Sequence, residues 1–158
     1  MKKRLPIWGV LLMLVVSADI AAAHCEIPCG IYGDEMRFDM IAEHITTVEK
    51  SMQMIVELSK AADRNDNQLV RWVMNKEEHA NYIQDIVSQY FLTQRIVVPD
   101  AKDPAVYERY VKQLALLQQM LVYAMKAKQS VDLVNVERLR VLLAEFKEMY
   151  VEHQHKKH

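Results

Sequence analysis

The sequence predicts an all-α fold, an up-down-up-down four-helix bundle, on three observations. Apolar residues recur at alternating steps of three and four along four separate segments, which is the spacing of one face of an α-helix. Only two glycines follow residue 23, and no hairpin turn separates alternating apolar and polar runs, so a sheet is disfavoured. The connections between the four segments are short or moderate, which favours antiparallel neighbours.

The first helix is predicted over residues 35–61, with Asp34 placed to cap it. Its apolar stripe consists of Ile41, Ile45, Val48, Met52 and Ile55. The polar run at residues 63–66 ends the pattern.

The second helix is predicted over residues 67–92. Its stripe consists of Leu69, Val73, Ala80, Ile83, Val87 and Tyr90, widened by Trp72, Ile86 and Phe91. Lys76 falls on this stripe, where we expect it to extend its ammonium group to solvent from the edge. His79 borders the stripe and is expected to be hydrogen-bonded there.

The third and fourth helices are predicted over residues 104–128 and 132–154. Asp103 followed by Pro104 is a strong start signal, because an acidic cap precedes a proline at the first helical position. The buried faces are expected to be Tyr110, Leu114, Leu117, Leu121 and Met125 in the third helix, and Leu139, Leu142, Leu143, Phe146, Met149 and Tyr150 in the fourth. The bundle then spans residues 34–158, with a frayed, histidine-containing end.

Residues 1–23 have the three parts of a cleaved secretory signal peptide. A basic start precedes an apolar core over residues 7–16, about half the length that a membrane-spanning helix needs, and three alanines follow at 21–23. Cleavage between Ala23 and His24 by a signal peptidase would give His24 a free amino group. The alternatives are an uncleaved anchor and a cut after Ala18.

Loss of the signal leaves one domain of 135 residues. Removing three positive charges and one negative charge changes the net charge from −1 to −3. Because no basic cluster survives, neither nucleic acid nor a membrane is an expected partner of the mature chain. We expect it to be exported to the periplasm or the outside of the cell, in preference to the cytoplasm.

Residues 24–33 are predicted to form a metal-binding hook. The amino group of His24, the amide nitrogen of Cys25 and the thiolate of Cys25 would lie in adjacent five-membered chelate rings, and Cys29 would add a second thiolate. Two nitrogens and two sulfurs in a plane suit Ni(II) or Cu(II). The imidazole of His24 can approach from above that plane, which suits a redox metal.

The alternative for the two cysteines is a structural disulfide between Cys25 and Cys29. Such a bridge closes a very short loop, for which chain entropy predicts little stabilisation. Pro28 and Gly30 allow the peptide to double back and bring the two sulfurs together in either case. The residue types alone leave disulfide and metal open.

The motif His-Cys-x-x-Pro-Cys-Gly-x-Tyr resembles the nickel hook of nickel superoxide dismutases. Its six fixed positions are matched by His24, Cys25, Pro28, Cys29, Gly30 and Tyr32. The resemblance covers essentially the whole chain after residue 23, although outside the hook it rests on the helical pattern.

This resemblance implies disproportionation of superoxide to oxygen and hydrogen peroxide by Ni(III)/Ni(II) cycling, with one nickel per subunit in a homohexamer. It implies that His24 supplies amine and imidazole, Cys25 amide and thiolate, and Cys29 thiolate. Tyr32 would stand beside the open face of the metal. Tyr90 resembles a second tyrosine near the metal.

The family also has a carboxylate that supports the metal site, for which Glu35 or Asp39 is the expected counterpart. A channel lined by Lys76 or His79 and carrying the superoxide anion is a further possibility. Two other functions stay open, an exported copper or nickel carrier and a structural helical protein with an inert Cys25–Cys29 disulfide.

Overall fold

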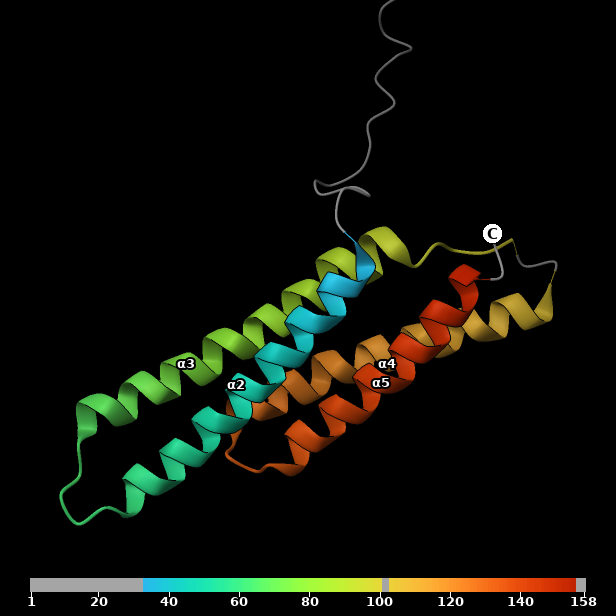
Figure 1. Ribbon diagram of the computed structural model, residues 1–158. Coiled ribbons are helices and arrows are strands. Elements are labelled where there is room, and N and C mark those ends of the chain that lie inside the picture. The colour runs from blue at the N-terminus through green and yellow to red at the C-terminus, as the bar shows by residue number, and fades with distance from the viewer. Residues whose placement is uncertain (1–32, 101–102, 156–158) are drawn as a thin grey trace, which may run out of the picture.

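Four long helical rods run antiparallel in the computed structural model of the chain, which describes residues 33–100 and 103–155 (Figure 1). The elements are α2 (Asp34–Lys60), α3 (Asp66–Asp85), the π-helix η2 (Ile86–Arg95), α4 (Pro104–Gln129) and α5 (Val134–His155). η2 continues α3, and no strand occurs in these two described ranges. The prediction of an all-α four-helix bundle is confirmed.

Each helix contacts its neighbours in the chain, and α2 also packs on α5, which closes the bundle (Figure 1). In this arrangement the start of α2, the end of η2 and the end of α5 lie at the same end of the molecule. We call this the hook end, because residue 33 is the last residue of the predicted hook.

The third helix begins at Pro104 as expected, and the other helix boundaries differ from the expected ones by one to three residues. The largest difference is at the second helix, which continues as η2 to Arg95 instead of ending at Leu92. Asp103 caps α4 as expected, because its carboxylate accepts hydrogen bonds from the backbone N–H groups of Ala105 and Val106. Asp34 does not cap α2, since Gly33 is the N-cap and Asp34 is the first helical residue.

The buried face of α4 is rotated relative to the expected one. Leu117 is shared, but Met125 is 42% exposed. The residues that face the interior are Gln113, Leu116, Leu117, Met120, Ala124 and Ala127. This observed stripe replaces the expected one as the buried face of α4. Its two alanines allow α4 to pack closely against its neighbours. In α3 the expected core residue Val73 is likewise 38% exposed.

Lys76 is buried instead of reaching solvent, with 4% of its surface exposed. Its ammonium group donates to the backbone carbonyls of Ala127 at 2.9 Å, of Lys128, and of Ser130 at 3.4 Å. These carbonyls lie at the end of α4, where the last turn of a helix leaves acceptors without intrahelical partners. The positive charge is stabilised there by the helix dipole, so the expectation of a solvent-exposed Lys76 was wrong.

An aromatic cluster fills the core near the hook end. Phe38 of α2 packs against Phe91 of η2 and Phe146 of α5, with ring centroids 5.0 and 5.7 Å apart. Tyr150 closes the cluster at 5.7 Å from Phe38. These rings fix the relative positions of the three elements that meet at the hook end.

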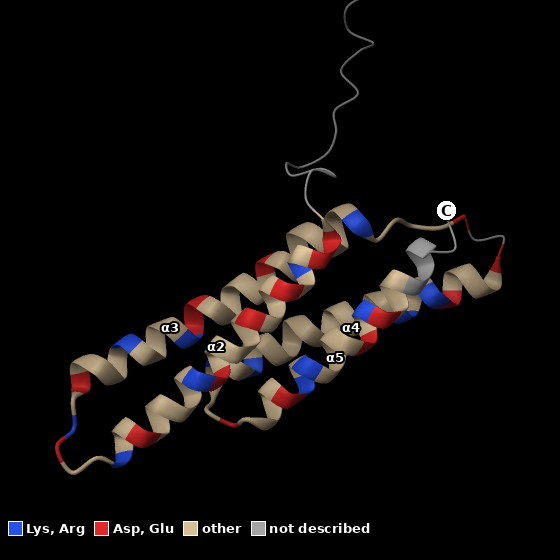
Figure 2. Cartoon of the chain, viewed as in Figure 1, with Lys and Arg blue, Asp and Glu red and all other residues tan. Residues whose placement is uncertain are grey.

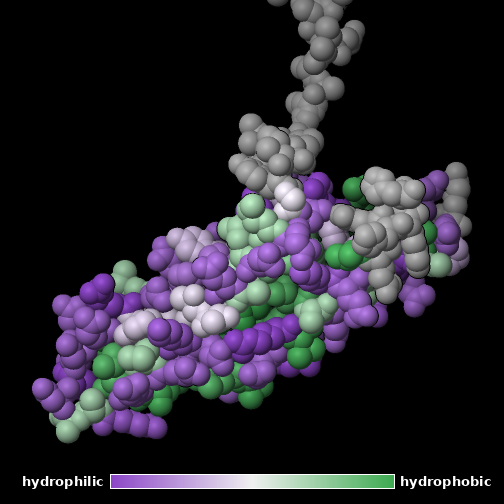
Figure 3. All heavy atoms as spheres, in the orientation of Figure 1, coloured by the Kyte–Doolittle hydropathy of each residue, from purple (hydrophilic) through white to green (hydrophobic). Residues whose placement is uncertain are grey.

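Basic and acidic residues are interspersed along the helices (Figure 2). Apolar side chains nevertheless reach the surface between them (Figure 3). They include Val70 and Met74 of α3 and Tyr107 and Val111 of α4. None of the helices in the described ranges is long and apolar enough to cross a membrane.

Candidate metal centre and the cluster beside it

The predicted nickel ligands His24, Cys25 and Cys29, the adjacent Tyr32 and the processing site Ala23–His24 lie outside the described residues. The chemistry of the donor set fits nickel, because thiolate sulfur and nitrogen donors in a plane suit Ni(II). Within the described residues, no group of three or more His, Cys, Asp or Glu side chains is placed to hold a metal ion.

A polar cluster surrounds Asp34 at the hook end. Its Oδ1 accepts hydrogen bonds from Arg95 Nε at 2.7 Å and from the Tyr90 hydroxyl at 2.5 Å, and it forms an ion pair with the same guanidinium at 2.6 Å. Its Oδ2 accepts from the Tyr150 hydroxyl at 2.9 Å. The Asp34 side chain is only 13% exposed. We call these four residues the Asp34 cluster.

The π-helical geometry of η2 makes this cluster possible. Its i→i+5 hydrogen bonds bring residues five apart closer to the same side than an α-helix does, and Tyr90 and Arg95 are five apart. Arg95 Nε is also 3.2 Å from the Tyr90 hydroxyl oxygen, to which it donates. Two other side chains follow the same spacing: Thr93 Oγ1 donates to the carbonyl of Ser88, and Gln94 Nε2 donates to the carbonyl of Gln89.

Burial raises the pKa of the Tyr90 hydroxyl, and the hydrogen bond to Asp34 raises it further against the opposing effect of Arg95. Tyr90 is therefore a neutral phenol at neutral pH, with its proton directed to Asp34. Two guanidinium groups lie near its ring, with the central carbons of Arg37 and Arg95 at 5.0 and 5.2 Å from the centroid. These cation–π contacts stabilise the positive charges of the two guanidinium groups beside the Tyr90 ring.

The three residues expected to support the metal site lie in different environments. Tyr90 is buried in the Asp34 cluster. Glu35 is exposed and forms an ion pair with Lys147 of α5. Asp39 is exposed on α2. The structure thus brings Tyr90 together with Asp34, and brings neither Glu35 nor Asp39 into that cluster.

Sequence reasoning missed three members of the cluster. Asp34 was assigned to helix capping, Arg95 fell beyond the predicted end of the second helix, and Tyr150 was taken only as a core residue. A signal existed in the spacing of Tyr90 and Arg95, but it is informative only once the π-helix is known.

His79 is hydrogen-bonded as expected, because its Nδ1 lies 3.0 Å from Nδ1 of His44 on α2. Tyr82 packs beside both imidazoles, with ring centroids 5.1 and 5.6 Å away. Burial and the neighbouring His79 lower the pKa of His44, which favours its neutral form.

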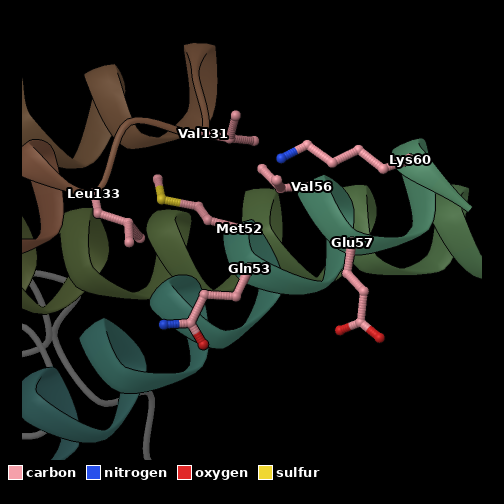
Figure 4. Close-up of a pocket in the computed structure, with 7 residues that line it drawn as sticks. All are labelled: Met52, Gln53, Val56, Glu57, Lys60, Val131 and Leu133. Atoms are coloured by element: carbon pink, nitrogen blue, oxygen red, sulfur yellow. The ribbon is translucent and has the colours of Figure 1, made fainter.

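A cavity of about 320 Å³ lies at the opposite end of the bundle from residue 33. Figure 4 shows Met52 and Val56 of α2 facing Val131 and Leu133 of the α4–α5 connection, with the Lys60 amino group extending toward Val131 and the Glu57 carboxylate turned away. Its walls are mostly apolar.

The described residues form an all-α four-helix bundle with a buried polar cluster at the end where the chain enters α2. The sequence model of the family described as nickel-containing superoxide dismutase matches residues 19–154, which include both the hook and the four helices. The chain belongs to this family, and it is a nickel-containing superoxide dismutase whose cofactor is nickel. No curated protein and no solved structure matches it.

Proposed function

We propose that superoxide disproportionation takes place at the hook, with the nickel held by His24, Cys25 and Cys29. The observation that carries the proposal is the family match across residues 19–154 together with the unbroken hook motif. Bound there, the nickel supplies one-electron redox chemistry between Ni(III) and Ni(II), and thiolate and amide donors favour the higher oxidation state. One ion per subunit follows from one hook per chain.

The protein residues have separate tasks in this proposal. The two thiols and the Cys25 amide must lose protons to become ligands, so loading depends on pH. Tyr32 positions the substrate or a water molecule beside the metal by hydrogen bonding. Tyr90, kept neutral by burial and by Asp34, supports the site from the bundle.

Export and activation are a single event in our proposal. The signal peptide directs the chain to the periplasm or outside the cell, and its cleavage between Ala23 and His24 by a signal peptidase creates the amine ligand. The small residues at 21–23 support this cut.

We further propose a homohexamer, in which neighbouring subunits cover the hook. Exposed apolar side chains on α3 and α4 support assembly, because apolar surface is a common component of subunit contacts.

The test combines a change of the terminus with changes of the ligands. One extra residue before mature His24, Cys25→Ser or Cys29→Ser should reduce nickel-dependent turnover to the rate of metal-free protein, because each removes a ligand. Circular dichroism should show unchanged helices, since the described core contains none of these residues. Metal analysis and N-terminal sequencing accompany the assay, and full activity of the extended form would exclude the amine ligand.

The same measurements distinguish the enzyme from the two other functions. A copper or nickel carrier would hold exchangeable metal without turnover. A structural protein with a Cys25–Cys29 disulfide would hold no metal. The family match favours the enzyme over both.

A further inference from the structure

We propose that Asp34 is a positioning residue for the nickel centre: its carboxylate fixes the Tyr90 hydroxyl and fastens the start of α2 to the end of the bundle. The inference rests on the proposed function of the hook, and it assigns a role to a residue that the hook motif does not contain.

Three side chains from two other elements converge on this carboxylate. Arg95 and Tyr90 reach Oδ1 from η2, and Tyr150 reaches Oδ2 from α5. A carboxylate offers about four lone-pair positions, so this number of donors leaves little freedom to rotate. Bonds to an ionised acceptor are also the stronger kind.

The position of Asp34 in the chain makes this attachment relevant to the hook. Gly33 alone separates it from Tyr32, so covalent geometry keeps the Cα atoms of Tyr32 and Asp34 within about 7 Å of each other. Gly33 itself has no side chain, and no other described residue lies within 4 Å of a Cβ added there. Asp34 is therefore the first described residue able to fasten the end of the hook.

The charges around Tyr90 give the proposal a second consequence. Among the described residues, the titratable groups seen in contact with Tyr90 or with Asp34 include Arg37, Arg95 and Tyr150. The Asp34 carboxylate raises the pKa of Tyr90 and Arg95 lowers it. Asp34→Asn would remove the charge that raises the pKa of Tyr90 and keep the effect of Arg95 that lowers it, so this pKa should fall.

The experiment compares two cluster variants with two matched controls. Asp34→Asn removes the charge with little change in shape, and Tyr150→Phe removes one donor while keeping the ring in the aromatic cluster. Glu49→Gln is the control for a lost ion pair, because Glu49 pairs with Arg140 between the same two helices, α2 and α5. Tyr82→Phe is the control for a lost tyrosine–carboxylate bond, here to the exposed Glu78.

We expect both cluster variants to fold and to take up one nickel per chain. Turnover per nickel should fall about tenfold in Asp34→Asn and less in Tyr150→Phe, as is typical when a group supporting metal ligands is lost. Nickel should be released faster to a chelator. The alkaline limb of the pH–activity profile should move to lower pH in Asp34→Asn only, and the two controls should match the wild type.

A readout independent of turnover separates this inference from the proposed function. In metal-free protein, tyrosine absorbance titration of Asp34→Asn should show one phenol ionising at lower pH, and adding Tyr90→Phe should abolish that change. If the cluster variants keep wild-type turnover, nickel release and titration, Asp34 has no positioning role. If the wild-type holoprotein lacks turnover, the proposed function fails, and nickel release and titration still decide on Asp34.

Discussion

Single buried polar residues in this bundle are explained by their partners more than by their place on a helical stripe. Lys76 shows this most clearly, because its ammonium group satisfies carbonyls at the end of α4. We predict that Lys76→Met lowers the free energy of unfolding by about 1–3 kcal/mol, since it leaves buried acceptors without a donor. Urea unfolding measures this. The exposed Lys50→Met is the control, and equal stability of both variants would show that water replaces the ammonium group.

The hook residues were assigned from sequence because their chemistry is local, and this assignment stays a prediction since they lie outside the described residues. A histidine and two cysteines at a fixed spacing offer metal donors whatever the rest of the chain does. The Asp34 cluster could not be predicted in this way. Its members come from three elements, and which carboxylate faces Tyr90 depends on how α2 is rotated against η2 and α5.

At the scale of elements, helix capping separates what sequence patterns determine from what tertiary contacts decide. Asp103 and Asp34 both precede or begin a helix, but only Asp103 has no competing partner among the bonds that the structure shows for it, and it caps α4. We predict that Asp103→Ala costs about 0.5–2 kcal/mol of stability and that Asp103→Asn costs less, because asparagine is also a good N-cap. Urea unfolding of both variants checks this, and an equal loss in the two would point to charge instead of capping.

Helix types and approximate limits follow from apolar periodicity, which is a property of neighbouring residues. The π-helical register of η2 and the rotated face of α4 do not, because both depend on packing against other helices. In α4 two stripes share Leu117, and only the neighbouring helices decide that Ala124 faces the interior while Met125 faces solvent.

At the scale of the whole molecule, the stability of the bundle should depend on pH through the contact of α2 with α3. His44 and His79 face each other across this contact with their Nδ1 atoms 3.0 Å apart, and Tyr82 lies beside both. Burial, followed by the nearby His79, lowers the pKa of His44 in the folded state, while Glu43 opposes this. The unfolded chain therefore binds a proton at His44 at a higher pH than the folded chain does.

The sign of the effect follows from this difference. A group that binds protons more readily when unfolded makes stability rise with pH, so the contribution is fully present above the ordinary histidine pKa of about 6.5 and is lost as pH falls through the lowered value in the folded state. We predict that the free energy of unfolding falls between pH 8 and pH 5, and that the double variant His44→Gln, His79→Gln shows a smaller fall over the same range. Urea unfolding of metal-free protein measures both slopes without interference from nickel loading.

The matched control is His79→Gln alone, which removes the repulsion but leaves the burial of His44, and should therefore give an intermediate slope. If all three proteins show the same slope, the acid sensitivity resides in groups other than His44.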